Sequence, residues 1–146
     1  MTCEFYLGAQ NYSIDNAIDG GDSWTMATNL KLGYEVSEKM GVYVKVSRDY
    51  GNTASRYTTT NTWAEGGVNY YFNPKIIGTA SLRYKESKYE SYNRTDETIW
   101  TRVGVSYLPN KFVTLGINYN YLNNDSDVST ANYNQHIVSF SATLRY

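Results

Sequence analysis

The sequence has very little cysteine and histidine, two residue types from which many catalytic and metal sites are built. Among 146 residues there is one cysteine, Cys3, and one histidine, His136. A single cysteine excludes an intrachain disulfide, and these two residues do not supply the spacing of a zinc site. No glycine-rich phosphate loop is present either. We find no catalytic constellation, so we expect a protein that is not an enzyme and that binds no metal and no cofactor.

Long apolar runs and a strong net charge are also missing. No stretch of about 18 apolar residues exists, which excludes a transmembrane helix. The net charge is −1, so a nucleic-acid partner is not indicated. Asn123-Asn124-Asp125-Ser126-Asp127 offers oxygen ligands for calcium, but it lacks the fixed spacing of a calcium loop. We therefore interpret this run as a solvated polar loop.

The sequence is rich in aromatic residues, above all tyrosine. Aromatic residues make up 16% of the chain, and 16 of its residues are Tyr. The mean hydropathy is −0.55, and Tyr, Thr, Val, Asn and Gly outnumber the strong helix formers. This composition favours an all-β fold. A low mean hydropathy is compatible with a membrane barrel, because only alternate strand residues need to face lipid.

The last dozen residues alternate strictly between apolar and polar side chains, which predicts an amphipathic strand. Seven further segments alternate in the same way. We expect strands over residues 3–14, 22–37, 41–51, 62–73, 76–90, 97–108, 112–123 and 134–146. Tight turns near residues 38–40, 73–75 and 109–111 alternate with longer polar loops, as in outer-membrane barrels. The predicted fold is a single domain, residues 1–146, forming an eight-stranded antiparallel up-and-down transmembrane β-barrel.

An internal repeat supports this organisation. Lys39, Lys75 and Lys111 lie in successive tight turns, each 36 residues after the last. Trp63 and Trp100 precede similar Gly-Val-x-Tyr segments at identical offsets. The tryptophans fall towards the long-loop ends of their strands, and tyrosines mark the other ends. We expect these residues to form two aromatic girdles at the level of the lipid headgroups: Trp24, Trp63, Trp100, Tyr34, Tyr70, Tyr107 and Tyr146.

The alternation divides the strand residues into two faces. The apolar face is predicted to contact lipid through Leu7, Leu32, Val44, Val68, Leu82, Val105, Leu115, Ile117, Phe140 and Leu144. The polar face is predicted to carry a lumen charge network of Glu4, Lys31, Glu35, Lys45, Asp49, Glu65, Arg83, Lys85, Arg102 and Arg145. Away from water these charges must pair, so we expect them to cross and close the lumen. A soluble barrel with its apolar face inward, and these charges in solvent, is the alternative.

The C-terminal third resembles the family of bacterial outer-membrane β-barrel porins. The residues that carry the resemblance are Tyr119-Asn120-Tyr121, Asn123-Asn124-Asp125-Ser126, Tyr133-Asn134 and the strand 138–146. The resemblance implies an outer-membrane location, contact with a lipid bilayer or detergent, and recognition of the last strand by the outer-membrane assembly machinery. Some members of the family are associated with exopolysaccharide export. Because Met1-Thr2-Cys3-Glu4 leads directly into a strand pattern, we expect a form from which the signal peptide is absent.

Three functions follow from these observations. The first is a small, non-enzymatic outer-membrane barrel with a polar, side-chain-filled lumen and a structural or surface-interaction role, in which the long loops contact an unknown surface ligand. The second is a porin or an exopolysaccharide export channel, formed as an oligomer or as a fragment of a larger barrel. The third is a soluble ligand-binding β-barrel. The number of strands and the filling of the lumen distinguish them.

Overall fold

The protein forms one antiparallel sheet in a computed structural model that describes residues 1–12, 23–52, 58–89 and 94–145. Within these residues there are eight strands and one short 3-10 helix, η1 (Ser129–Ala131). The strands are β1 (Thr2–Tyr12), β2 (Ser23–Ser37), β3 (Met40–Asn52), β4 (Thr58–Asn73), β5 (Ile76–Tyr89), β6 (Arg94–Asn110), β7 (Val113–Ser126) and β8 (Tyr133–Leu144).

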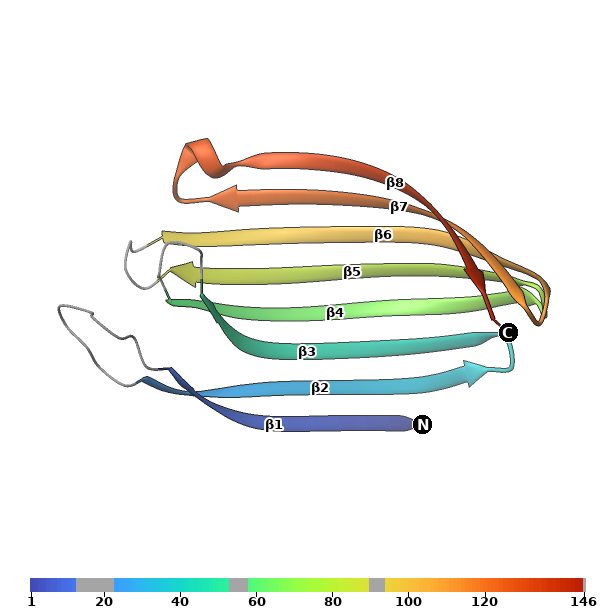
Figure 1. Cartoon of the computed structure of the whole chain (residues 1–146), viewed down its shortest axis with the longest axis horizontal. Helices are drawn as coiled ribbons and strands as arrows, with labels where there is room; N and C mark the ends of the chain where they lie inside the picture. Colours follow the sequence, from blue (N-terminus) through green and yellow to red (C-terminus); the bar gives the residue numbers. More distant parts are fainter. Residues whose placement is uncertain (13–22, 53–57, 90–93, 146) are drawn as a thin grey trace.

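Each strand pairs with its neighbours in chain order, from β1 to β8 (Figure 1). The predicted eight strands and their up-and-down antiparallel order are therefore confirmed. The largest difference from prediction lies at the loop end of β4, which begins at Thr58 and not at residue 62, and the loop ends of β6 and β7 also extend beyond the predicted bounds. There, Asp96 pairs with Ser126 in a region predicted to be loop, because antiparallel pairing continues past the last apolar residues of both strands.

The three tight turns have the same local chemistry. In each turn a polar side chain accepts a hydrogen bond from the backbone N–H two residues later: Ser37 from Lys39, Asn73 from Lys75 and Asn110 from Phe112, at 2.8–3.3 Å. Serine and asparagine favour such turns because their side chains can replace a backbone acceptor.

Each tight turn also bonds to the strand that follows its hairpin. The carbonyl of Lys39 accepts from the N–H of Tyr71, that of Lys75 from Leu108, and that of Phe112 from Arg145, at 2.7–2.8 Å. Each turn therefore lies shifted along the next strand. A stagger of this kind, repeated in one direction, is what tilts the strands of a curved or barrel-forming sheet.

The sheet is not closed, which corrects the predicted barrel. Strands β1 and β8 lie at opposite edges (Figure 1), and each has a single neighbour in the sheet. No contact joins β1 to β8 among the described residues. Local pairing settles which strands are neighbours, but closure depends on the curvature and stagger summed over all strands. The alternation of residues along one strand does not indicate this total curvature and stagger.

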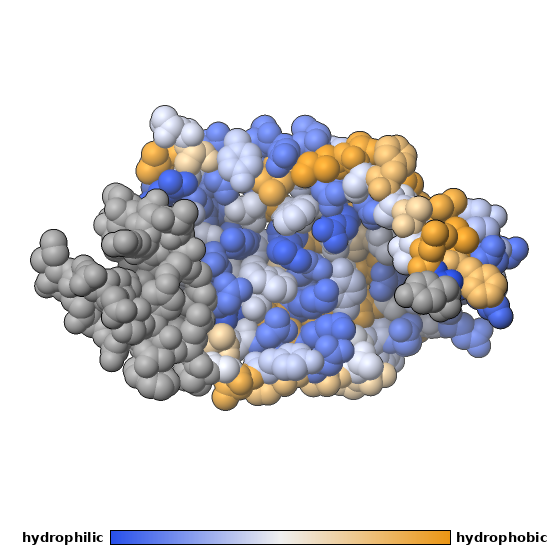
Figure 2. All heavy atoms as spheres, viewed as in Figure 1, coloured by the Kyte–Doolittle hydropathy of each residue, from blue (hydrophilic) through white to orange (hydrophobic). Residues whose placement is uncertain are grey.

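The burial pattern is the reverse of that in a soluble domain. Among the described side chains, no hydrophobic residue is buried, and Phe140 and Leu144 are 79% and 74% exposed. The buried polar residues are Ser47, Thr59, Thr60, Glu65, Ser87, Asp96, Asn120 and Asn124. Hydrophilic side chains fill the middle of the face seen in Figure 2, and hydrophobic ones lie along its upper and lower margins. The polar face is therefore the crowded one, as expected for the concave side of a curved sheet.

No helix in the described part of the chain is long and apolar enough to cross a membrane.

Candidate functional site: the polar face of the sheet

The functional groups of the polar face meet where the strand register places them directly opposite one another. Lys45 of β3 pairs with Glu65 of β4, Glu65 with Arg83 of β5, and Arg83 with Trp100 of β6. Directly opposed residues share one face and lie within reach of each other. One row across four strands thus contains two cations, one carboxylate and one indole ring.

Glu65 is the centre of this row. Its side chain is only 8% exposed and forms an ion pair with the guanidinium of Arg83. The Nε of Arg83 donates to Oε2 of Glu65 at 2.7 Å, and the hydroxyl of Tyr43 donates to Oε1 at 3.0 Å. The ammonium of Lys45 lies 3.7 Å from the same Oε1. A buried carboxylate is stable only when its oxygens are paired and hydrogen-bonded, and here three donors satisfy them.

Two tryptophan rings lie close to the guanidinium of Arg83. The guanidinium carbon of Arg83 lies 4.5 Å from the ring centroid of Trp63 and 5.5 Å from that of Trp100. Guanidinium groups bind aromatic faces because of the negative charge of the ring quadrupole. Trp63 and Trp100 therefore lie on the polar face.

This placement corrects the predicted girdle, in which both tryptophans contact the lipid headgroups. Trp63 is two residues from Glu65, and Trp100 is two residues from Arg102, so the alternation places each indole on the charged face. Position along the strand alone favours a girdle, whereas alternation places both indoles on the polar face. The side chain of Trp24 and the whole of Tyr146 lie outside what the structure describes.

Arg102 extends the cluster to β7. Its Nε donates to Oδ1 of Asn120 at 2.8 Å, and its guanidinium lies 5.5 Å from the ring of Trp100. Arg83 and Arg102 thus share one indole ring. Together with Glu65, Ser81 and Trp100 they line a small cavity. The Nε1–H of Trp100 is buried and has no hydrogen-bond partner among the described residues.

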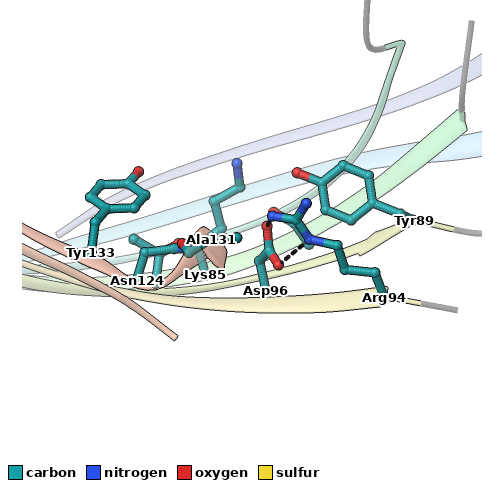
Figure 3. Close-up of a pocket in the computed structure, with 9 residues that line it drawn as sticks. Lys85, Tyr89, Arg94, Asp96, Asn124, Ala131 and Tyr133 are labelled. Atoms are coloured by element: carbon teal, nitrogen blue, oxygen red, sulfur yellow. Dashed lines mark hydrogen bonds and ion pairs between the residues drawn. The ribbon is translucent and has the colours of Figure 1, made fainter. Parts of the chain in front are cut away.

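A larger pocket of about 340 Å³ lies nearer the loop end of the same face (Figure 3). In it Asp96 accepts two hydrogen bonds from the guanidinium of Arg94, at 2.6 and 2.7 Å, and one from the hydroxyl of Ser126. The ring of Tyr89 lies 5.0 Å from the same guanidinium. Asn124 and Lys85 complete this part of the wall. Lys85 forms no ion pair with any described residue, so its charge faces the pocket uncompensated.

The remaining predicted lumen charges lie apart from the Glu65 cluster. Lys31 and Glu4 form their own pair at 2.9 Å, with both side chains well exposed. The Glu35 carboxylate lies over Gly41, Asp49 is half-buried opposite Asn61, and Arg145 is exposed next to the end of β8.

The ion pairs of the predicted lumen charges connect adjacent strands along the wall, and none crosses to a distant strand among the described residues. The expectation that these charges cross and close the lumen is therefore wrong for this open sheet, because opposite walls do not face each other at contact distance.

The apolar face carries the residues predicted to contact lipid. Nine of the ten are exposed, for example Leu82 at 55%, and Val68 is half-buried. Tyr34, Tyr70 and Tyr107 are exposed on the same face near the tight turns. His136 is also exposed, and its Nδ1 lies 2.7 Å from the hydroxyl of Tyr119.

The apolar face ends in a polar row on the loop side. Strand register aligns six residues across β2 to β7 in this row: Thr28, Arg48, Thr62, Glu86, Glu97 and Asp125. On the tight-turn side of this row, every second residue of β5 from Ile76 to Tyr84 is apolar or small. The apolar face is thus a band that ends at this polar row on the loop side.

Four residues of the polar face are absent from the predicted lumen network. Tyr43 and Asn120 have the same alternation as the predicted lumen charges but carry no charge, so a pattern of charges alone does not indicate them. Arg94 and Asp96 lie before the predicted strand 97–108, in a region expected to be loop. Alternation could have indicated the first two, whereas the ion pair required knowledge that β6 begins at Arg94.

No group of acidic, histidine or cysteine side chains that could hold a metal ion occurs within the described ranges. The protein family described as Putative beta-barrel porin 2 matches residues 52–146. No curated protein and no solved structure matches the chain.

Proposed function

Because the chain belongs to the β-barrel porin family described as Putative beta-barrel porin 2, we propose that its sheet is part of the wall of a transmembrane channel in the bacterial outer membrane. The apolar face contacts lipid, and the polar face lines an aqueous lumen. The observation that carries this proposal is the reversed burial: the hydrophobic side chains are outside and the polar ones are crowded together.

The dimensions of the apolar band support a membrane-spanning wall. On β5 it runs from Ile76 to Tyr84, which at roughly 3.3 Å per residue is about 26 Å along the strand. Tilted strands need about 9–11 residues to cross the hydrocarbon layer. The polar row that contains Glu86 and Glu97 lies where charged side chains would reach water, and the exposed tyrosines lie near the opposite boundary.

The open sheet favours a wide lumen over a plugged eight-stranded barrel. An eight-stranded barrel is just wide enough for its own side chains to fill. Here the polar face bears Trp63, Trp100, Arg83 and Arg102, and their contacts run along the wall. We propose that further strands pair with the edges of β1 and β8 and complete a wider ring. The plugged, structural barrel is the second candidate, supported by the even number of strands.

Membrane insertion is tested by refolding the chain in detergent or lipid vesicles. The folded protein should migrate differently on a gel before and after boiling. A monodisperse monomer with β-type circular dichroism in the absence of detergent would contradict the proposal, because the exposed apolar band would then be stable in water.

The ring size is tested with the native cysteine. Cys3 lies on the apolar face of edge strand β1, and Phe140, Ala142 and Leu144 lie on the same face of edge strand β8. Each of these three is replaced by Cys in turn, and disulfide formation is induced in vesicles. An eight-stranded barrel would give an intrachain disulfide in at least one variant. A wider ring would give disulfides only between chains, or none. The same variants carrying Cys3→Ser are the control.

A further inference from the structure

The cavity between Arg83, Arg102 and Trp100 has more positive charge than its surroundings neutralise. Among the described residues, Glu65 is the only carboxylate that lines it, and that carboxylate is shared between Arg83 and Lys45. Arg102 donates to the neutral amide of Asn120. Three cations and one anion therefore leave two positive charges in excess at this point of the wall.

The two guanidinium groups are also held together by the same ring. Each lies 5.5 Å from the centroid of Trp100. The ring attracts both but contributes no net negative charge, so their mutual repulsion remains. A third group that carries negative charge and contacts both would remove this repulsion.

Trp100 provides a separate indication of a missing acceptor. Its Nε1–H is buried without a partner among the described residues, and indole nitrogen can only donate. A buried donor without an acceptor is unfavourable. Arg83, Arg102 and Trp100 line a cavity of about 10 Å³, which is room for a single small occupant.

We propose that this cavity binds a small inorganic anion of halide size, held by Arg83, Arg102 and the Nε1–H of Trp100. Within the proposed channel the anion would be at the wall of the lumen. Lys85 lies on the same face two residues beyond Arg83 and lines the larger pocket near the loop end. Its uncompensated charge would attract anions from that end towards the cavity. The inference rests on the proposed function only in placing this face in water.

The test uses fluorescence of Trp100, because iodide quenches an indole that it contacts. The folded chain in detergent carries Trp24→Phe and Trp63→Phe, so that Trp100 is the only tryptophan. Sodium iodide is exchanged for sodium gluconate at constant ionic strength. We expect saturable quenching that chloride reverses by competition. Acrylamide, which is uncharged, should quench without saturation.

Three variants decide whether the named groups form the site. Arg102→Gln should raise the half-saturating iodide concentration about tenfold or more, because a charge-assisted contact is lost. Arg102→Lys should have a smaller effect, and Glu65→Gln should lower the half-saturating concentration by removing the competing anion. Lys88→Gln is the matched control. Lys88 lies outside the cavity, and its Nζ is 3.0 Å from the carboxylate of Glu86.

Quenching that is unsaturable in the parent chain, or that changes as much in Lys88→Gln as in Arg102→Gln, would overturn the anion site and leave water as the occupant. This outcome is independent of the channel, because the assay requires only the folded chain. Conversely, saturable iodide binding in a protein that fails to insert into vesicles would refute the channel and retain the anion site.

Discussion

The polar and apolar faces of this sheet differ in how their side chains contact one another. On the polar face Glu65 contacts side chains from β3 and β5, and Arg83 contacts two tryptophans. On the apolar face Leu82, Val105 and Leu115 are each more than 40% exposed. The polar face is therefore stabilised within the chain, whereas the apolar face needs an apolar surrounding. Substitutions on the two faces should therefore destabilise the protein for different reasons.

The largest expected effect is at Glu65. Glu65→Ala leaves Arg83 and Lys45 without their carboxylate, so we expect a loss of roughly 3–5 kcal/mol in the free energy of unfolding. Urea titration in lipid vesicles, followed by fluorescence, measures it. Glu35→Ala is the matched control, because Glu35 lies on the same face and is exposed. Equal losses in the two variants would show that the Glu65 cluster does not stabilise the wall.

The next effect concerns the apolar band. Leu115→Arg or Val105→Arg should cost about 2–4 kcal/mol if the residue lies near the bilayer midplane. Their neighbours on the polar face, Thr114 and Ser106, should tolerate Asn with little change, because that face is polar. The same urea titration compares the four variants. If the polar-face substitutions cost as much as those to Arg, the assignment of the faces is wrong.

A smaller effect is expected from the tryptophan that packs on Arg83. Trp63→Leu should cost about 1–2 kcal/mol through the lost cation–π contact. In a chain that already carries Arg83→Met, the same substitution should cost clearly less. This double-mutant cycle separates the contact with Arg83 from the burial of the ring. An unchanged cost would mean that Trp63 acts only through its apolar area.

The smallest effect is expected at the exposed pair of Lys31 and Glu4. Both side chains are well exposed, and exposed ion pairs contribute little because solvent screens them. Lys31→Ala should leave the urea midpoint unchanged within error, in contrast to Glu65→Ala. A clear destabilisation would indicate that β1 is less exposed in the membrane than in the isolated sheet, as pairing with a further strand would require.

Much of the fold could be predicted because alternation is a local property. Each strand shows its two faces in its own residues, so eight strands and the composition of both faces follow without knowledge of the neighbours. For Trp63 and Trp100, position along the strand indicates a girdle, whereas alternation indicates the polar face. Trp63 has the alternation of Glu65, and this signal was present in the sequence.

The partners within the polar face could not be predicted in the same way. Alternation places Glu4, Glu35 and Glu65 on the same face as the arginines and lysines and does not choose partners among them. Strand register decides between them, because it places Glu65 directly opposite Arg83 and Glu4 opposite Lys31. A register shift of two residues would preserve both faces and change every partner.

The sequence by itself determined the strands, their order and the two faces, because these depend on the alternation of side chains and on short turns. Only the tertiary structure decided that the sheet stays open and that Arg83 and Arg102 share the ring of Trp100. Curvature and stagger accumulate over eight strands, and the contacts of the polar face depend on register between strands distant in the chain. The residue pattern of a single strand specifies neither the total curvature and stagger nor the register.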